Sequence, residues 1–574
     1  MDRITQGIVD EFVKNFDLGR EAPEEQFEHF VNVAVVSSEY HESFDPADVH
    51  VGKDANPGID GLAIIVNGSL VTEEEEVEDL LGTNKYLEVT FIFTQAKTSS
   101  SFDGADMGSF IEAVRDFFRE KPRLVRGQDL KAKAAIADRV FKNTAKMRSN
   151  TVCLMFYVTT GTWQDDQNLL ARLAQGKQEL EATSLFSEVR STPCGAKEIQ
   201  RLYRASKEAV AVEIDFPSKV TLPEIENVSQ AFVGVVPVAT LFQLITDDSG
   251  NIRRSVFEDN IRDFQGDTSV NAAIAETLSS PGSSRFVVLN NGITVVCREL
   301  AQTGNKCTLH GYQVVNGCQT SHILLENRDK FDPNRVLVTL KLVGSANEEL
   351  VNAIIRATNS QNAVKPEELE AMTEFQKQLE LYYGTFSGSQ ALYYERRSKQ
   401  WAASPAEKTR VVTIPTQIKA FASMFLSAPH RVAGYYGTVR RKLGDTIFRN
   451  DHRQLPYYTS AYALYRLECL FRSRTLDAKY KPLKWFLLLL FRQAVGGAMP
   501  VLNSKMMDNY CEGLLAVLRD NPCAAGAFDT ITSKLHGVFP PLSSDHLKTQ
   551  SYRDSLLATI GDGELARAND AVGS

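Results

Sequence analysis

Two stretches of this chain decide its fold: Gly58-Ile59-Asp60-Gly61, which leads into an apolar run, and Leu87-Glu88-Val89-Thr90-Phe91-Ile92-Phe93-Thr94-Gln95-Ala96-Lys97. Side chains of a β-strand alternate between its two faces. Gln95 and Lys97 therefore share a face with the apolar residues Leu87, Val89, Phe91 and Phe93. Asp60 shares a face with Leu62, Ile64 and Val66 in the same way. Three polar side chains therefore lie at the ends of the apolar faces of two predicted strands. Burying them costs free energy unless they have bonding partners or a function.

These polar side chains have the chemistry of a phosphodiester-cutting site. Such a site needs a divalent cation held by oxygen ligands, an activated water and compensation of negative charge. Asp60 and the amide oxygen of Gln95 can be the ligands, and Lys97 can orient the water and offset charge. Glu28 is the fourth candidate, because it borders the core-facing stripe of a helix predicted over residues 22–38. The simpler interpretation, in which Asp60 closes a turn and Lys97 only reaches solvent, stays open.

The order Phe27-Glu28, Gly58-Ile59-Asp60-Gly61, Gln95-Ala96-Lys97 resembles the Mrr-like branch of the PD-(D/E)XK nucleases. In that branch Gln commonly replaces the acidic residue before x-Lys. The resemblance implies a restriction-endonuclease-like α/β/α fold, with Asp60 and Gln95 as ligands of Mg²⁺ or, in its place, Mn²⁺. It implies a catalytic role for Lys97 and an accessory role for Glu28. It also favours DNA over RNA as the substrate.

The chain is long enough, at 574 residues, for several domains. Strands alternating with helices predict an α/β domain over residues 1–216, covered on both faces of its sheet. This domain includes an acidic insert at 72–79, expected to be a solvated loop or short helix, and a long helical region at 108–146. After a linker at 217–223, we expect a central α/β domain over 217–400 and a mainly helical C-terminal domain over 401–574. The central strands are predicted at 286–297, 312–315 and 336–342, followed by a helical tract at 348–383.

A second resemblance covers the later part of the chain. Its motifs are Phe257–Arg262, Asn290–Thr294, Val314–Thr320, Ala357–Asn362, Tyr393–Arg397 and Trp401. With Gln95–Asp103, they resemble the AIPR family, the abortive-infection phage-resistance proteins. The resemblance implies bacterial antiviral defence, with a nuclease joined to a central AIPR-type domain.

Amide, aromatic and basic side chains supply candidates for nucleic-acid contact. Asn316-Gly317 lies where a predicted strand turns into a helix, so backbone N–H groups there could bind phosphate. The amides of Asn316 and Gln319 could contact base edges, although Asn-Gly also makes ordinary tight turns. The remaining candidates combine stacking rings and cations, as a nucleic-acid strand requires: Tyr394, Arg396, Arg397, Arg440, Arg441 and Lys442. A packed helix end with a solvated basic face is the alternative interpretation.

Composition narrows the classes of protein. The net charge of −9 and the pI near 5.7 argue against a general nucleic-acid coat protein. The eight Cys residues form no CxxC pair, which argues against a zinc module or a disulfide framework and fits a reducing cytoplasm. The N-terminus has no apolar signal-peptide core, and the apolar run Trp485–Phe491 is too short to cross a bilayer. We therefore expect a cytoplasmic protein without a membrane partner.

The sequence thus predicts a magnesium-dependent nuclease, a hydrolase that cuts phosphodiester bonds of DNA in antiphage defence. Further expected partners are a second copy of the chain and a phage-derived trigger or operon-encoded protein. Two alternatives remain. One is a non-catalytic nucleic-acid sensor that keeps the nuclease fold as a relic, and the other is a nuclease that cuts RNA.

Overall fold

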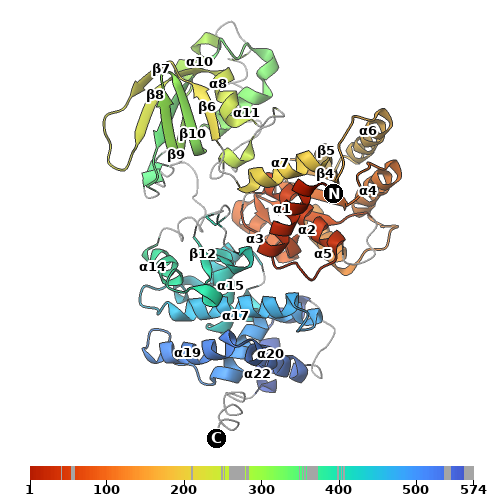
Figure 1. Cartoon of the computed structure of the whole chain (residues 1–574), viewed down its shortest axis with the longest axis vertical. Coiled ribbons are helices and arrows are strands. Elements are labelled where there is room, and N and C mark those ends of the chain that lie inside the picture. Colours follow the sequence, from red (N-terminus) through yellow and green to blue (C-terminus); the bar gives the residue numbers. More distant parts are fainter. Residues whose placement is uncertain are drawn as a thin grey trace. The chain divides into compact units, whose positions relative to one another are not determined.

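The computed structural model divides the chain into two compact units, whose elements are labelled in Figure 1. The first unit comprises residues 1–36, 42–200 and 365–574, and the second comprises residues 37–41 and 201–364. The structure describes the whole chain except residues 41, 53–57, 208–210, 247–249, 251–252, 258–277, 279–282, 348–349, 352, 355–356, 358–372, 397–399, 402–403, 405–406, 433, 536–543 and 561–574. Two distant parts of the sequence therefore belong to one unit, and the second unit is inserted between them.

The N-terminal part of the first unit contains a five-stranded mixed sheet. Its strands, in spatial order, are β2 (Ser69–Leu70), β1 (Gly61–Val66), β3 (Val89–Lys97), β4 (Thr151–Thr159) and β5 (Phe186–Cys194). β1 is antiparallel to β3, and β3, β4 and β5 are parallel. Leu62 pairs with Phe93 and Gly61 with Thr94, so the predicted common face of the two strands is present. Every residue of β1 is buried, as a sheet covered on both faces requires.

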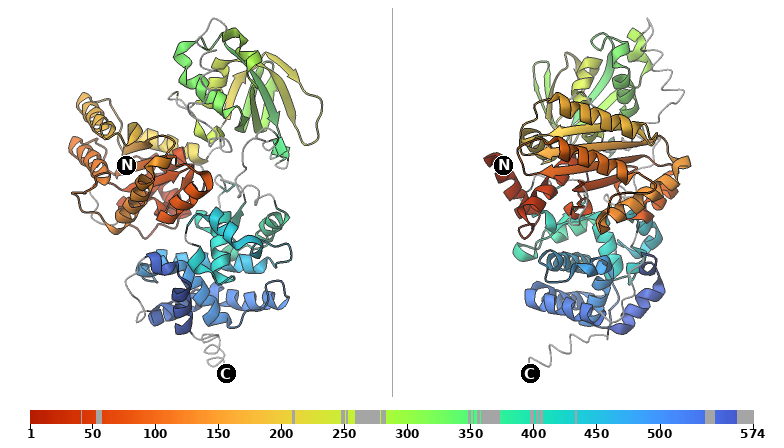
Figure 2. Two further views of the ribbon diagram at one scale, coloured as in Figure 1. Left: turned by 180° about the vertical axis from the view of Figure 1, so that it is seen from behind. Right: turned by 90° about the vertical axis from the view of Figure 1, so that its right-hand side faces the viewer.

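Helices pack against this sheet on both sides, as the two views in Figure 2 show. They are α1 (Arg3–Asn15), α2 (Pro23–Glu39), α3 (Glu74–Asn84), α4 (Gly104–Phe117), α5 (Gln128–Lys142), α6 (Gln167–Glu181) and α7 (Ala196–Lys207). The helix predicted at 22–38 is α2, which begins at Pro23, a residue suited to the first turn of a helix. The long helical region predicted at 108–146 is present, but it is divided into two helices, α4 and α5. Pro122 and Gly127 lie between them and break the helix.

The acidic segment, predicted as a solvated loop or short helix, is a helix, α3, but it contacts the C-terminal part of the same unit instead of only solvent. Glu73 Oε2 accepts a hydrogen bond from the backbone N–H of Gly434 at 3.2 Å, and Asp79 Oδ2 accepts one from Tyr435 at 3.1 Å. In the same contact Lys419 Nζ lies 3.6 Å from Glu76 Oε1, Lys548 forms an ion pair with Glu75, and the ring of Tyr435 joins the hydrophobic core around the first sheet. The acidic residues therefore have bonding partners rather than a purely solvating role.

The second unit contains a six-stranded sheet. Its strands, in spatial order, are β6 (Ala211–Asp215), β10 (Lys306–Asn316), β9 (Ile293–Thr303), β11 (Leu337–Gly344), β8 (Gln230–Pro237) and β7 (Ser218–Thr221). Only the β9–β11 pair is parallel among these described strands. The helices of this unit include α8 (Val238–Ile245), α10 (Phe286–Leu289) and α11 (Cys318–Glu326). The result is a mixed α/β unit, as the sequence predicts.

Three details of the second unit differ from the sequence prediction. The expected linker at 217–223 is an edge strand, β7, which pairs with β8. The predicted strand at 286–297 begins only at Ile293, because Phe286–Leu289 forms a helical turn. Ala211–Asp215, which falls within the α/β domain predicted over 1–216, is the edge strand β6 of this second sheet and pairs with β10. The strands predicted at 312–315 and 336–342 lie within or along β10 and β11.

The C-terminal part of the first unit is mainly helical, as predicted. It contains α14 (Glu374–Tyr383), β12 (Tyr393–Glu395), β13 (Val411–Thr413), α15 (Ile414–Met424), α16 (Tyr436–Leu443), α17 (Leu455–Arg472), α18 (Lys484–Phe491), α19 (Met506–Arg519), α20 (Asn521–Leu535), α21 (Ser544–Leu547) and α22 (Gln550–Thr559). The predicted helical tract at 348–383 falls largely outside the described residues. The apolar run of α18 is buried in the core of this region, and none of the helices that the structure describes has the length and apolar character to cross a membrane.

Gly434 offers a test of the contact between α3 and the C-terminal region. Its φ is +98°, and a Cβ atom there would lie 2.6 Å from Asp79 Oδ2. We expect Gly434→Ala to lower the free energy of unfolding by about 1–2 kcal/mol or more, because strained backbone and a displaced carboxylate both cost free energy. Urea unfolding of the full chain measures this. Gly444→Ala is the matched control, since Gly444 also has a positive φ but nothing within 4 Å of the added Cβ. Equal losses in the two variants would contradict a specific contact at Gly434.

Candidate active site

Asp60 lies at the start of β1 and is fixed by backbone contacts. Its N–H donates to the carbonyl oxygen of Thr94 at 3.0 Å, and its Oδ2 accepts from the N–H of Ala96 at 2.8 Å. From α2, Asn32 donates to the Asp60 carbonyl oxygen at 3.1 Å. The close approach depends on Gly61, whose Cβ would lie 2.2 Å from Asn32 Oδ1. The carboxylate is thereby held at the end of the β1–β3 pair.

Gln95 and Lys97 lie at the C-terminal end of β3, at the same end of the β1–β3 pair as Asp60. Gln95 is 3% exposed, and no described residue donates a hydrogen bond to its Oε1. Gly58, in the left-handed region at φ +71°, lies against its Nε2. The Lys97 side chain is 34% exposed, and its Nζ lies 4.0 Å from Asp106 Oδ2. The two side chains differ in role accordingly: a buried amide with a vacant acceptor, and an ammonium group that reaches solvent.

Glu28 projects from α2 towards the same edge. Its Oε2 lies 2.8 Å from His50 Nε2. Burial of the Asp60 carboxyl group raises its pKa to about 7, and the charge of Glu28 contributes to this rise. The Ala96 N–H and the charges of Lys97 and His50 act in the opposite direction. The structure thus brings Glu28, Asp60, Gln95 and Lys97 together, which the sequence order alone had only suggested.

The donor set at this edge fits a hard divalent cation. Gln95 Oε1 is a buried acceptor lacking a described donor, and it belongs to the residue that follows the Asp60-bonded Thr94. Burial favours the protonated form of Asp60, and a bound cation would favour the ionised form instead. Within the described residues no three His, Cys, Asp or Glu side chains form a metal-binding group. Asp60 and Gln95 would therefore share the cation with water, an arrangement typical of Mg²⁺.

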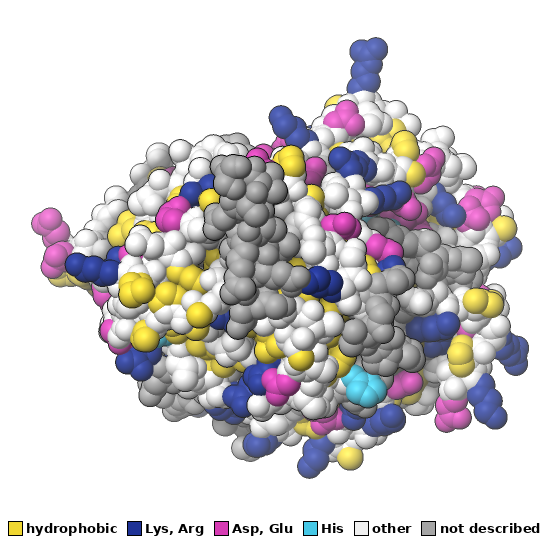
Figure 3. Space-filling view, turned by 90° about the horizontal axis from the view of Figure 1, so that it is seen from below, with side chains coloured by type: hydrophobic (Ala, Val, Ile, Leu, Met, Phe, Trp, Pro, Cys, Tyr) yellow, Lys and Arg dark blue, Asp and Glu magenta, His cyan; other side chains and the backbone are white. Residues whose placement is uncertain are grey.

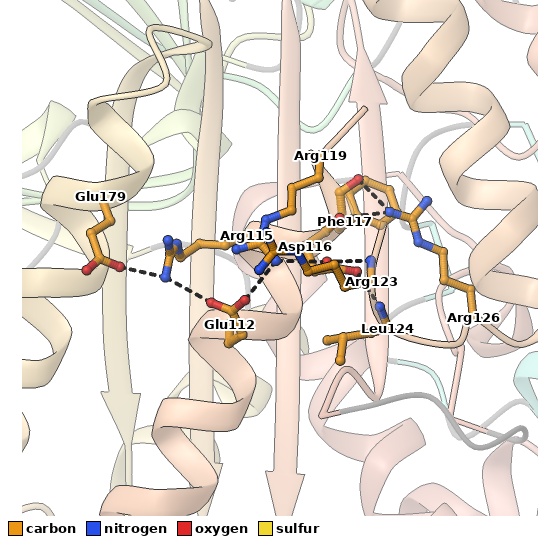
Figure 4. A network of polar contacts seen from close by, with 9 residues as sticks. All are labelled: Glu112, Arg115, Asp116, Phe117, Arg119, Arg123, Leu124, Arg126 and Glu179. Carbon is orange, nitrogen blue, oxygen red and sulfur yellow. Dashed lines mark hydrogen bonds and ion pairs between the residues drawn. The ribbon is translucent and has the colours of Figure 1, made fainter. Parts of the chain in front are cut away.

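The helix α4 places a further acidic residue at the site. Asp103 caps its N-terminus by accepting from Ala105 and Asp106 N–H groups at 2.7 and 3.0 Å, which puts Asp106 in the first turn, facing Lys97. The far end of α4 is anchored by Asp116, which accepts from the N–H groups of Arg123 and Leu124 at 2.9 and 3.0 Å (Figure 4). Although burial of Asp116 raises its pKa, these donors hold it below its ordinary value. Both ends of α4 are therefore fixed.

Three residues near the site escaped the sequence analysis: His50, Asp106 and Tyr157. Tyr157 pairs with Gln95 across β3 and β4, and burial, together with the charges of Asp106 and Asp103, raises its pKa. The signal for Asp106 was the helix-capping residue Asp103 directly after the Gln-x-Lys strand. His50 and Tyr157 carry no comparable local pattern.

The aromatic and basic candidates for nucleic-acid contact are only partly on the surface. Tyr394 is 1% exposed, with its hydroxyl bonded to Gln376, so it is a core residue and its ring cannot stack on bases in this structure. Arg396 Nε donates to Glu380 at 2.8 Å, and Arg440 donates to the Gly444 carbonyl oxygen at 2.6 Å. Arg441 and Lys442 are exposed on α16, and Arg397 lies outside the described residues. On the face in Figure 3, basic side chains lie scattered among acidic ones rather than gathered in one patch.

Asn316 and Gln319 belong to the second unit. Asn316 ends β10, and Gln319 lies in the first turn of α11, with Gly317 between them at φ +93°. A Cβ on Gly317 would lie 2.3 Å from Ile293 Cδ1, so this turn requires glycine. The predicted strand-to-helix turn is present, and both side chains are half-buried. Their contact with a nucleic acid stays a prediction.

Comparison with known proteins supports the second resemblance. The fold is that of a mixed α/β protein with a polar site at the strand ends of its first sheet and a helical C-terminal region. More particularly, the family model described as AIPR protein matches residues 257–502. The match runs from the second unit into the C-terminal helices and does not include the residues around Asp60, Gln95 and Lys97. No curated protein and no solved structure matches the chain.

Proposed function

We propose that this protein is a cation-dependent nuclease that hydrolyses phosphodiester bonds, with DNA as the substrate, in bacterial defence against phage. The observation that carries the proposal is the convergence of Asp60, Gln95 and Lys97 at one sheet edge, where Gln95 Oε1 is buried and has no described donor. A stable fold seldom leaves a buried acceptor without a partner. A ligand role for Gln95 accounts for this acceptor.

Each residue has a separate task in the proposed reaction. Asp60 and Gln95 would hold Mg²⁺ or Mn²⁺, which supplies Lewis-acid polarisation of the phosphate and lowers the pKa of a water. Lys97, on the solvent side of the site, offsets the negative charge that grows on the phosphate as the bond breaks. Asp106 limits the positions of Lys97 by its 4.0 Å contact. Glu28 adds negative charge on the α2 side.

Two further arguments define the biological setting and the substrate. The match of residues 257–502 to the AIPR family supports a role in abortive infection. The Mrr-like order of Glu28, Asp60 and Gln95-Ala96-Lys97 favours DNA. The net charge of −9 predicts weak binding of bare DNA at physiological salt, so a phage-derived trigger, an operon-encoded partner or assembly of several copies would strengthen it.

Incubation of purified protein with plasmid and phage DNA, methylated and unmethylated, tests the proposal. Strand scission that requires Mg²⁺ or Mn²⁺ and stops with EDTA is the expected result. Matched RNA in parallel reactions separates the RNA-cleaving alternative, which predicts the opposite preference.

A non-catalytic sensor is the second candidate, favoured by the absence of a three-residue acidic or histidine metal group among the described residues. It predicts that a Lys97→Ala protein still protects cells from phage. A plaque assay that compares wild type with Lys97→Ala distinguishes the two, because a nuclease mechanism predicts loss of protection.

A further inference from the structure

His50 is held next to the candidate site by backbone pairing. It forms an antiparallel bridge with Gly61, the first residue of β1. Val51 N–H donates to the Asp60 carbonyl oxygen at 3.1 Å, and Leu62 N–H donates to the Val49 carbonyl oxygen at 2.8 Å. The segment Val49–Val51 therefore extends the sheet beside the start of β1. A side chain in this position has little freedom to move away from Asp60.

The His50 side chain contacts Glu28 in an enclosed setting. The His50 side chain is 2% exposed, and its Nε2 lies 2.8 Å from Glu28 Oε2. The ring of His29, a buried residue of α2, lies 4.1 Å from the His50 ring, centroid to centroid. The neighbouring His29 ring thus limits the positions of the imidazole that contacts the Glu28 carboxylate.

The lack of a side chain at Gly52 gives room for the Glu28–His50 contact. A Cβ atom on residue 52 would lie 2.6 Å from Glu28 Oε2 and 3.0 Å from His50 Nε2. The φ of Gly52 is not in the left-handed region, so the backbone itself does not require glycine. The absence of a side chain at this position therefore serves the Glu28–His50 contact.

From this geometry we propose that His50 is a positioning residue of the cation site, which acts by holding the Glu28 carboxylate at the sheet edge beside Asp60. The inference rests on the proposed function, because it assigns a task to Glu28 at that site. Glu28, His50 and Asp60 do not form a direct metal-binding group, so Glu28 would act on a bound cation as an outer carboxylate, through water. Partners of this kind typically change metal affinity by 10- to 100-fold.

Isothermal calorimetry of the metal-free full chain with Mn²⁺ tests the proposal without an activity assay. His50→Leu, which keeps the volume but removes the N–H, is expected to weaken Mn²⁺ binding by about 10- to 100-fold. His50→Gln, whose amide nitrogen can reach Glu28 Oε2, is expected to restore most of the affinity. Circular dichroism and the thermal midpoint confirm that each variant is folded.

Two further variants separate positioning from a general loss of structure. In a Glu28→Gln background, His50→Leu is expected to cause no additional loss, because the two residues act through one contact. Gly52→Ala removes no polar group and is expected to weaken binding by displacing the pair, so it replaces His50→Leu if that variant does not fold.

The outcomes distinguish this inference from the proposed function. If Asp60→Asn abolishes Mn²⁺ binding but His50→Leu and Gly52→Ala change it less than twofold, the positioning role of His50 is refuted and the cation site stands. Additive losses in the Glu28→Gln background also refute it. If the wild-type chain binds no Mn²⁺, both the inference and the proposed function are overturned.

Discussion

The Lys97→Ala protein is expected to cleave DNA about 10²- to 10³-fold more slowly than wild type, while it folds normally. In the proposed reaction Lys97 would contact the phosphate of the substrate, and its charge should then lower the free energy of the transition state more than that of the ground state. Its side chain is 34% exposed, and its Nζ lies 4.0 Å from Asp106 Oδ2. A partly exposed pair of this kind contributes little to stability, on the order of 1 kcal/mol at most.

Single-turnover cleavage of a labelled duplex in saturating Mg²⁺ measures the effect of Lys97→Ala directly. Lys142→Ala is the matched control, because Lys142 is an exposed lysine at the end of α5 on the same sheet domain. The control is expected to retain the wild-type rate. If both variants cleave at the wild-type rate, Lys97 has no role in the reaction, and the site must be assigned elsewhere.

The second large effect is that of Asp60→Asn on stability. This substitution is expected to abolish cleavage but to raise the stability of the protein. We expect Asp60→Asn to stabilise the metal-free protein at pH 8. In the folded state the pKa of Asp60 is about 7, against an ordinary value of 3.8. The folded protein therefore retains a proton that the unfolded chain has lost between these values, and stability falls as the pH rises through this window.

Asparagine carries no charge and keeps an oxygen that can accept the Ala96 N–H. The stability difference between Asp60→Asn and wild type should therefore grow by about 2–3 kcal/mol between pH 5 and pH 8. Urea unfolding in EDTA at the two pH values measures this change. Mg²⁺ is expected to narrow the difference by stabilising wild type alone.

Asp103→Asn is the control for this prediction. Asp103 caps α4, and the N–H groups of Asp106 and Ala105 hold its pKa below the ordinary value. Asparagine is an equally good helix cap, so this variant should gain no stability at pH 8. If the stability gained by Asp60→Asn over wild type did not increase with pH, the raised pKa of Asp60 from burial and the nearby charge of Glu28 would be contradicted.

The sequence predicted that Asp60, Gln95 and Lys97 lie at one end of the β1–β3 pair, because the relevant information is local. Alternation along β3 places Gln95 and Lys97 on one face, and the same rule places Asp60 on the face of Leu62 and Ile64 in β1. The pairing of Leu62 with Phe93 then joins the two faces. The α/β character of the first 200 residues and the helical C-terminal region follow from equally local periodicity.

Features that depend on distant contacts were not predicted. The acidic residues in and just before α3 look solvated in sequence. Four of them, Glu73, Glu75, Glu76 and Asp79, have partners more than 300 residues away, at Gly434, Lys548, Lys419 and Tyr435. Likewise, Tyr394 next to arginines has the pattern of a stacking surface, although its ring is buried. His50 joins the site through a bridge to Gly61, which no spacing rule indicates.

The central claim is that Asp60 and Gln95 would hold a divalent cation with which the protein hydrolyses phosphodiester bonds. The most direct measurement is the fraction of supercoiled plasmid nicked as Mg²⁺ is added back to EDTA-treated wild-type and Asp60→Asn proteins. The account predicts nicking that saturates with Mg²⁺ in the wild type and is lost in the folded variant. Equal nicking by both proteins, or none by the wild type with Mg²⁺, Mn²⁺, DNA or RNA, would contradict it.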